Sequence, residues 1–170
     1  MTVEATSAGS NAAASGDAPS PPVAQRVAAV RGAARFSKAM EVVLGEVGLS
    51  LPQYRLLLFL SGGPERASAL AGSLGVSPPS LTALVDGCVA RGLVERVASE
   101  EDRRRVLHLI TAEGHRALAA GDAALAERLD AIAAHLTPAQ AKKLVEGLEL
   151  MGQGLDALRE ARRAEQAAAR

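Results

Sequence analysis

The stretch LAGSLGVSPPSLTALVDGCVARGLVERV, residues 70–97, contains the pattern that decides the fold. Leucines one helical turn apart predict a short helix over residues 66–74, and the Gly-Val-Ser at residues 75–77 interrupts it with a tight turn. Ser77 can cap a second helix, because its hydroxyl accepts a backbone N–H and the proline after it suits the first helical position. That helix is expected to end at Gly92. Two short helices joined by a three-residue turn that contains glycine form a helix-turn-helix.

Two strands and a charged loop follow the second helix. Residues 93–97 and 106–110 alternate loosely between apolar and polar side chains, which predicts two short strands. Residues 98–105 between them are mostly charged, offer nothing to a core and include three consecutive arginines. A strand, a charged loop and a strand directly after a helix-turn-helix form a wing. The stretch therefore predicts a winged helix-turn-helix.

A further helix is predicted immediately before this unit. Ser50 and Gln53 have the spacing of a capping box, and Pro52 sits in the first turn, where its missing N–H costs little. The helix is expected over residues 53–61, and the Gly-Gly-Pro of residues 62–64 ends it.

Longer helices flank the winged unit on both sides. Apolar residues recur at helical spacing over residues 23–47, with Gly48 as the stop. Thr111 can cap a helix over residues 112–136. A second capping box, Thr137-Pro-Ala-Gln, opens a helix whose leucines step by four and three residues. Such heptad-like seams bury their apolar side chains against partner helices, so the two ends of the chain are expected to form a dimer.

The expected fold is therefore mainly α with a small two- to three-stranded β wing, a winged helix-turn-helix flanked by dimerisation helices. No internal repeat is visible in the sequence. The expected organisation is a disordered tail at residues 1–22, an N-terminal dimerisation helix at 23–47, the winged helix-turn-helix at 48–111, C-terminal dimerisation helices at 112–165 and a disordered tail at 166–170.

The composition allows DNA binding without favouring it. The 170 residues are 48% apolar and have a formal net charge of zero, whereas nucleic-acid-binding domains are often basic. Of the 19 basic residues 16 are arginines, whose planar guanidinium suits phosphates and base edges. No apolar run approaches the ~20 residues of a membrane span, no signal peptide is recognisable, and a single cysteine excludes an internal disulfide. A reducing cytoplasm is the expected location.

The sequence shows no pattern typical of catalysis or metal binding. His108, His115 and His135 are scattered, and no cluster has the spacing of a zinc site. No phosphate-binding glycine loop or nucleophile elbow is present. Cys88 falls on the inward stripe of the second helix, where a cysteine usually behaves as a small apolar residue. The chain is therefore not expected to be an enzyme or to need a cofactor or metal.

Six short sequence motifs follow one another between Leu49 and Leu118: LSLPQYR at 49–55, LAxxLGVS at 70–77, TxxVD at 82–86, RGLVER at 91–96, EDRR at 101–104 and LITxxG at 109–114. Each motif alone is a weak indication of a family, but their order and spacing together resemble those of the multiple antibiotic resistance regulator (MarR) family. The resemblance implies an obligate homodimer with a winged helix in each subunit, bound to double-stranded DNA at a pseudo-palindromic operator near the prokaryotic nucleoid. It also implies repression that a small aromatic or phenolic ligand, or oxidation, relieves.

The second helix of the helix-turn-helix is expected to lie in the major groove. Its hydroxyls can form hydrogen bonds with base edges, and Ala83 or the methyl group of Thr82 can contact a thymine methyl. The alternative is that Ser77 only caps the helix and the other side chains are solvated. Family members often have basic side chains where this chain has Ala83 and Gly87, so affinity is expected to depend more on the wing. The predicted base-reading residues are Ser77, Pro79, Ser80, Thr82 and Ala83.

By resemblance, Arg104 at the wing tip enters the adjacent minor groove, where a narrow groove attracts arginine. Asp86 is its expected partner within the subunit, and Asp102 is expected to help orient the wing. Arg103 and Arg105 are expected to neutralise phosphates, which positions the protein without reading sequence. The alternative for such a charged run is a solvated loop.

A small-molecule pocket is expected in the cleft between the winged unit and the helical ends. Ordinary core packing is the alternative role of its candidate residues. They are Phe36, Met40, Tyr54, Arg55 and Phe59.

The leading hypothesis is therefore a sequence-specific DNA-binding transcriptional regulator, a repressor released by a ligand. A competing hypothesis is a protein-interaction module whose winged helix has lost specific DNA binding. Zero net charge and the uncharged Ala83 and Gly87 motivate it. An enzyme that uses an interdomain cleft is a third hypothesis, and paired titratable groups in that cleft would be its signature.

Overall fold

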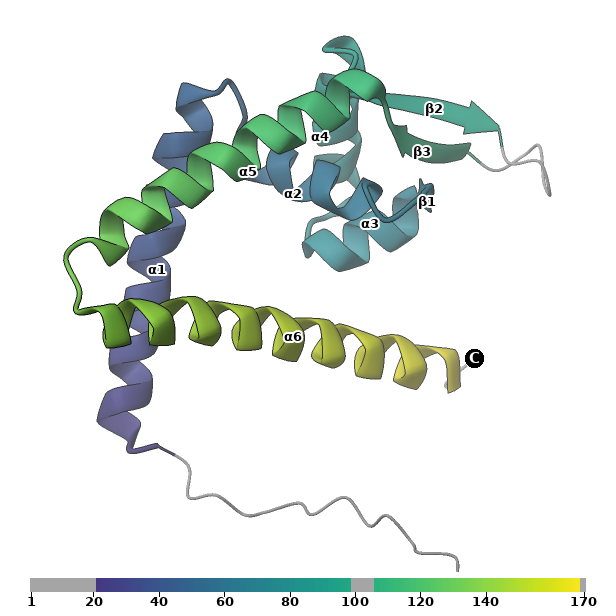
Figure 1. Ribbon diagram of the computed structural model, residues 1–170. Coiled ribbons are helices and arrows are strands. Elements are labelled where there is room, and N and C mark those ends of the chain that lie inside the picture. The colour runs from purple at the N-terminus through teal and green to yellow at the C-terminus, as the bar shows by residue number, and fades with distance from the viewer. Residues whose placement is uncertain (1–20, 99–105, 169–170) are drawn as a thin grey trace, which may run out of the picture. The chain divides into compact units, whose positions relative to one another are not determined.

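The structure is a computed structural model that describes residues 21–98 and 106–168. Over these residues the chain forms six helices and three short strands (Figure 1). Their order is α1 (Val23–Glu46), α2 (Leu51–Leu60), β1 (Glu65–Arg66), α3 (Ala67–Leu74), α4 (Pro78–Ala90), β2 (Val94–Ala98), β3 (Val106–Ile110), α5 (Ala112–Ala133) and α6 (Pro138–Ala168).

The mainly helical fold with a small antiparallel wing is confirmed. The expected fold allowed a third strand, but the position of the two-residue β1 was not predicted, because two residues show no periodicity and its conformation depends on pairing with a distant strand. Helix α2 begins at Leu51, two residues before its expected start, and α5 ends at Ala133, three residues before its expected end. The missing turn of α5 is a tight turn in which the N–H groups of His135 and Leu136 donate to carbonyls three residues back.

The three strands form one sheet in the order β1-β3-β2, with β3 in the centre. Both neighbours pair antiparallel to β3, which places His108 between Glu65 of β1 and Arg96 of β2. Strands β2 and β3 pair along their whole lengths, from Val94 opposite Ile110 to Ala98 opposite Val106. The two outer ends of this ribbon therefore lie side by side.

Side-chain caps begin three of the helices, as the sequence predicts. The Ser50 hydroxyl accepts from the backbone N–H of Gln53 and the Gln53 side chain accepts from that of Ser50, so α2 has a complete capping box. Ser77 accepts from the N–H of Ser80 at the start of α4, and Thr111 caps α5. Each such cap contributes about 1 kcal/mol of stability.

The core lies where α2, α3, α4, β2 and α5 meet, and the last turns of α1 add Leu44 to it. Helix α4 faces this core with Leu81, Val85 and Cys88, each at most 2% exposed. The predicted inward position of Cys88 is thus confirmed, and burial raises the pKa of its thiol. The core consists of Leu44, Leu49, Leu56, Leu57, Leu60, Leu70, Leu74, Leu81, Val85, Cys88, Leu93, Val94 and Leu118.

Helix α5 approaches this core at two glycines. A Cβ atom on Gly114 would lie 2.1 Å from the carbonyl oxygen of Leu93, and one on Gly121 would lie 3.0 Å from the Tyr54 ring. At the same crossing the Thr111 N–H donates to the Leu93 carbonyl oxygen at 3.1 Å, and its hydroxyl donates to that of Gly92 at 2.6 Å. The start of α5 is therefore fastened to the turn between α4 and β2.

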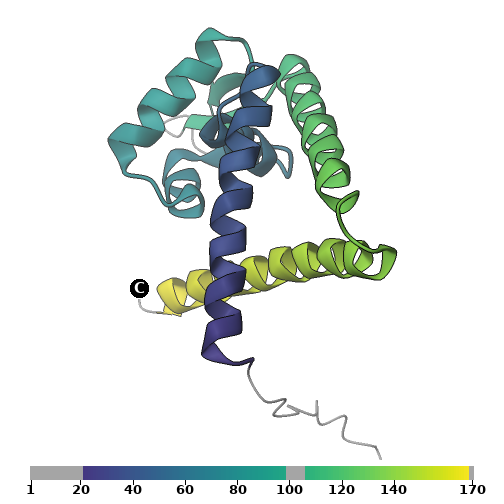
Figure 2. The ribbon, with the colours of Figure 1, turned by 90° about the vertical axis from the view of Figure 1, so that its left-hand side faces the viewer.

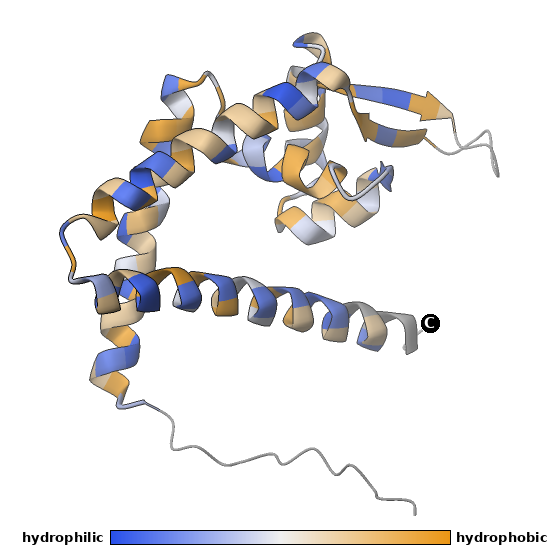
Figure 3. Ribbon diagram, in the orientation of Figure 1, coloured by the Kyte–Doolittle hydropathy of each residue, from blue (hydrophilic) through white to orange (hydrophobic). Residues whose placement is uncertain are grey.

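The chain divides within α1 into two compact units, Met1–Arg35 and Phe36–Arg170. In the first unit the described part of α1 exposes a stripe of valines. In the second unit α6 alternates between apolar and charged residues along its length (Figure 3), and none of its described side chains is fully buried. Among the described residues no single helix is long and apolar enough to cross a membrane, although the bent pair α1 and α2 together meets that criterion.

The close approach at Gly114 predicts a large loss of stability for Gly114→Ala. The added methyl group overlaps the Leu93 carbonyl oxygen, so α5 must move away, at a cost of about 3 kcal/mol. For a domain of this size that corresponds to a fall in Tm of roughly 6–12 °C. Gly72→Ala is the matched control, because a Cβ there meets no atom within 4 Å and an alanine favours the helix. Thermal unfolding that is equal for both variants would contradict the predicted overlap.

Candidate nucleic-acid interface

The outer face of α4 is the first part of the candidate interface. With Leu81, Val85 and Cys88 turned inward, the helical period places residues 79, 82, 83 and 86 on one outer stripe. Figure 2 shows α4, in teal, on the side of the winged unit away from α5, in green. All five predicted base-reading residues are exposed: Ser77, Pro79, Ser80, Thr82 and Ala83.

Three hydroxyl groups at the start of α4 form hydrogen bonds within the helix. The Ser77 and Ser80 hydroxyl oxygens lie 2.8 Å apart, and the Ser77 oxygen also accepts from the Ser80 N–H at 3.3 Å. The Thr82 hydroxyl donates to the Pro78 carbonyl oxygen at 3.0 Å. The proton of Thr82 and one proton of the serine pair are therefore engaged, which leaves lone pairs as the main polar groups that these side chains offer outward.

The charge on α4 is a single carboxylate. Asp86 is its only ionisable acid or base apart from buried Cys88, and no lysine or arginine lies between Pro78 and Ala90. The Arg96 guanidinium on β2 donates to the Asp86 carboxylate. The Asp86 side chain is 55% exposed and that of Arg96 is 39% exposed, so the pair contributes at most about 1 kcal/mol to stability. It nevertheless connects the exposed face of α4 to the strand that leads into the wing.

This ion pair was not predicted. The expected partner of Asp86 is Arg104, which lies outside the described residues, as do Asp102, Arg103 and Arg105. The sequence could have indicated Arg96 as the partner, since Arg96 belongs to the RGLVER motif and lies on a strand beside α4. The described ends of the wing, Ala98 and Val106, are paired directly. The residues between them are thus attached to the outer end of the β2–β3 ribbon.

His108 is the buried polar group at the base of the wing. It is 5% exposed at the centre of the sheet, and its Nδ1 lies 3.3 Å from the Glu65 carbonyl oxygen. Burial lowers the pKa of His108 from its ordinary value of 6.5, the hydrogen bond to the Glu65 backbone opposes the shift, and the charge of nearby Arg96 adds to it. The neutral imidazole is therefore the form that the folded wing favours.

Three of the five predicted pocket residues make identified contacts within the fold. The Tyr54 hydroxyl donates to Asp122 of α5 at 2.7 Å, and burial together with this carboxylate raises the pKa of Tyr54 far above its usual range. The Arg55 guanidinium donates to the Leu74 carbonyl oxygen at 3.3 Å. Phe36, Met40 and Phe59 are half-buried, and Phe59 packs against the core.

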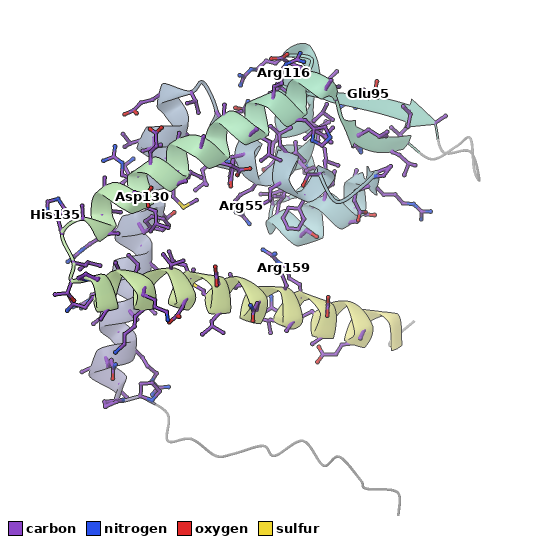
Figure 4. All side chains as sticks on the ribbon, in the orientation of Figure 1. Arg55, Glu95, Arg116, Asp130, His135 and Arg159 are labelled. Atoms are coloured by element: carbon purple, nitrogen blue, oxygen red, sulfur yellow. The ribbon has the colours of Figure 1, made fainter. Side chains whose placement is uncertain are left out.

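Arg159 of α6 contacts an aromatic ring of the winged unit. Arg159 leaves α6 toward α2, on the same side as Arg55 (Figure 4), and its guanidinium lies 5.0 Å from the centre of the Phe59 ring. Asp156 accepts a hydrogen bond from the same guanidinium at 2.9 Å. A cation over an aromatic ring at an exposed site contributes about 0.5–1 kcal/mol, so this contact is easily broken.

Two of the hollows on the described surface bear on a ligand site. One of about 440 Å³ lies along the first turns of α1, and one of about 210 Å³ lies between the end of α1 and α5. Neither is lined by a predicted pocket residue. Over residues 21–98 and 106–168 no three histidine, cysteine or acidic side chains gather where they could hold a metal ion. The site that the described residues assemble is thus an exposed helix face beside a wing.

Comparison with known proteins agrees with this geometry. Residues 47–105 match the model of the MarR family. The uncharacterized HTH-type transcriptional regulator YfiV of Bacillus subtilis (strain 168) is 28% identical over 116 residues, which are 65% of this chain and 70% of that protein. The crystal structure of RV1404 from Mycobacterium tuberculosis superposes with a TM-score of 0.65 at 26% identity, over 80% of this chain and 96% of that one.

A second solved structure contains nucleic acid. The transcriptional repressor CouR, bound to a 23-mer DNA duplex, superposes with a TM-score of 0.61 at 27% identity. The match covers 74% of this chain and 89% of CouR. The similarity to both solved structures extends beyond the winged unit to most of the chain.

The buried, neutral His108 predicts a pH-dependent stability. Because its folded pKa lies below 6.5, the folded state binds fewer protons than the unfolded state once the pH falls below 6.5. The stabilisation is full above pH 6.5 and declines as the pH falls toward the folded pKa. Thermal unfolding between pH 7.5 and 5.0 should therefore show a smaller fall in Tm for His108→Asn than for the unchanged chain. His135→Asn, at an exposed position, should keep the original pH dependence, and parallel curves for all three proteins would contradict this assignment.

Proposed function

We propose that the chain, whose residues 47–105 match the model of the MarR family, is a winged-helix transcriptional regulator of that family and a sequence-specific repressor. It binds a pseudo-palindromic operator as a homodimer and leaves it when a small aromatic or phenolic ligand binds. Family and fold are those of transcriptional regulators and not of enzymes. The finer steps of this proposal are supported by the geometry of α4, the wing and the terminal helices.

The observation that carries the proposal is the exposed face of α4. Its inner stripe of Leu81, Val85 and Cys88 is buried, and its outer stripe presents three uncharged side chains and one carboxylate next to a two-stranded ribbon. A helix of this kind enters the major groove, which is wide enough for an α-helix. In this proposal α4 reads bases through Ser77, Pro79, Ser80, Thr82 and Ala83.

The wing supplies the charge that α4 lacks. We assign Arg104 to the minor groove, Arg103 and Arg105 to phosphates, and Asp102 to the orientation of the loop. The ion pair between Asp86 on α4 and Arg96 on β2 would keep the wing aligned with α4. A dimer that neutralises about six to eight phosphates should have a slope of about −5 to −7 in log affinity against log salt.

The partner subunit is a second copy of this chain, packed on the terminal helices. The apolar seam of α6 has Leu144 and Leu148 half-buried and its later members 45–49% exposed, which is unusual for a 31-residue helix in water. Helix α1 also exposes valines, among them Val23, Val27 and Val30. The exposed seam of α6 consists of Met151, Leu155 and Leu158. In a symmetric dimer two half-sites about one helical turn apart would meet the two copies of α4.

The ligand would act where α6 and α5 meet the winged unit. Phe36, Met40, Tyr54, Arg55 and Phe59 are the residues assigned to this region. Tyr54 is bound to α5 through Asp122, and Phe59 to α6 through Arg159. A ligand that competes for these contacts would favour one separation of the two wings over another, and binding to DNA would change by that difference in affinity.

A second candidate function is a protein-interaction module. The absence of any lysine or arginine from α4 favours it, because most DNA-reading helices carry basic side chains. The wing arginines and the DNA-bound relative favour the repressor. Binding experiments with specific and scrambled duplexes separate the two functions.

Titration with DNA is the first test of the repressor. Fluorescence anisotropy with DNA from upstream of its own gene, and with a scrambled duplex, should show a preference for the former that falls steeply with salt. Arg104→Ala should lose about 1–3 kcal/mol of binding free energy per subunit and flatten the salt dependence. Arg162→Ala, on α6 outside the winged helix, is the control and should bind as the unchanged chain does. Weak binding that does not distinguish duplexes selected from a genomic library would favour the interaction module.

If α6 forms the dimer interface, a charge placed in its apolar seam should weaken the dimer, whereas a charge on another face of α6 should not. Sedimentation should give twice the 17.4 kDa of one chain. Leu155→Glu places a carboxylate in the seam of both subunits and should raise the dimer dissociation constant by about 1,000-fold, since each buried leucine contributes about 2 kcal/mol. Gln153→Glu adds the same charge about half a turn away and should leave the dimer intact. Equal effects of the two substitutions would show that the seam is not the interface.

A further inference from the structure

We infer that α4 recognises thymine through its C5-methyl group, by contact with the methyl groups of Thr82 and Ala83. The inference rests on the proposed function, because it names what the proposed DNA-reading helix reads. It follows from which atoms of α4 remain available after the hydrogen bonds and ion pairs of the described residues are formed.

The available surface at the middle of the stripe is carbon. Ala83 is exposed and offers only a methyl group. Thr82 is exposed too, but its hydroxyl is held by the Pro78 carbonyl oxygen at 3.0 Å, so its methyl group is the part without a hydrogen bond. The exposed ring carbons of Pro79 extend this apolar surface by one turn toward the start of the helix.

Most of the polar groups around this surface are engaged. Ser77 and Ser80 bond to each other at 2.8 Å, which uses one of their two hydroxyl protons, and Ser77 also accepts the Ser80 N–H. The Asp86 carboxylate, which could otherwise accept from a cytosine amino group, is bound by Arg96. The same salt bridge keeps the Arg96 guanidinium beside α4 and occupied, and α4 itself has no basic side chain.

The major groove offers one group that matches such a surface. Guanine presents two acceptors that are read by arginine or lysine, adenine is read by a side-chain amide, and cytosine presents an amino donor. Helix α4 has no arginine or lysine and no side-chain amide, and its only acid, Asp86, is paired with Arg96. The thymine methyl is the apolar group of the groove, and its burial against another methyl needs no polar partner.

The test removes that methyl group from the DNA without changing any hydrogen bond. A duplex selected by this protein from a random library is synthesised with deoxyuridine in place of thymine, one symmetric pair of positions at a time. At the contacted positions affinity should fall by about fourfold per lost methyl, the value for one buried carbon group. Deoxyuridine at positions outside the two half-sites is the control and should change nothing.

Two variants identify the protein atoms. Thr82→Ser removes the methyl and keeps the hydroxyl that donates to Pro78, so the helix is preserved. Ala83→Gly removes the other methyl and costs about 1 kcal/mol of helix stability, which a folded domain tolerates. A variant that lacks the contacting methyl should bind thymine and deoxyuridine duplexes equally at that position, whereas the unchanged chain discriminates between them.

The outcomes are distinct. Loss of discrimination in at least one variant, at a thymine that the unchanged chain requires, establishes the contact. If the chain prefers its selected duplex but no deoxyuridine weakens binding, or if both variants still discriminate, methyl recognition by these residues is wrong and the repressor function stands. If no duplex is preferred over a scrambled one, the proposed function fails and this inference fails with it.

Discussion

Burial of the inner stripe of α4 is the constraint on which the rest of the structure depends. Leu81, Val85 and Cys88 are nearly inaccessible, so the helix cannot rotate without exposing apolar surface that contributes about 1.5–3 kcal/mol for each large side chain. The orientation of the outer stripe follows from this burial alone. The face that we propose to read bases is therefore positioned by the core, and substitutions on that face should leave the fold intact.

The second fixed point is the turn between α4 and β2, where α5 begins. Gly114 allows the α5 backbone to approach the Leu93 carbonyl, and Thr111 bonds to the carbonyl oxygens of Gly92 and Leu93. Because α5 leads toward α6, it connects α6 to the point where the wing leaves α4. The Tyr54–Asp122 hydrogen bond joins α5 to α2 further along, so α5 is attached to the winged unit at two places.

Local signals made most of this fold predictable. Ser50, Ser77 and Thr111 were expected as caps, and each caps its helix, because capping depends on residues three apart. Strand β1 and the Asp86–Arg96 pair were missed, because both depend on chain segments that meet only after folding. The exposure of the predicted base-reading residues follows from helical periodicity, whereas the engagement of their hydroxyls does not. The wing arginines remain predictions, since they lie outside the described residues.

The lack of basic side chains on α4 would shape how such a regulator responds to a ligand. Without basic side chains on the reading helix, the electrostatic part of the binding free energy must come from the wing and from the rest of the surface, where its strength depends on distance to the phosphates. Apolar contacts are short-ranged and require correct seating of α4 in the groove. In the proposed dimer both contributions would therefore weaken when the separation of the two subunits changes by a few ångströms. Under this proposal, a recognition helix without basic side chains would make the affinity for DNA depend strongly on the geometry that α5 and α6 impose.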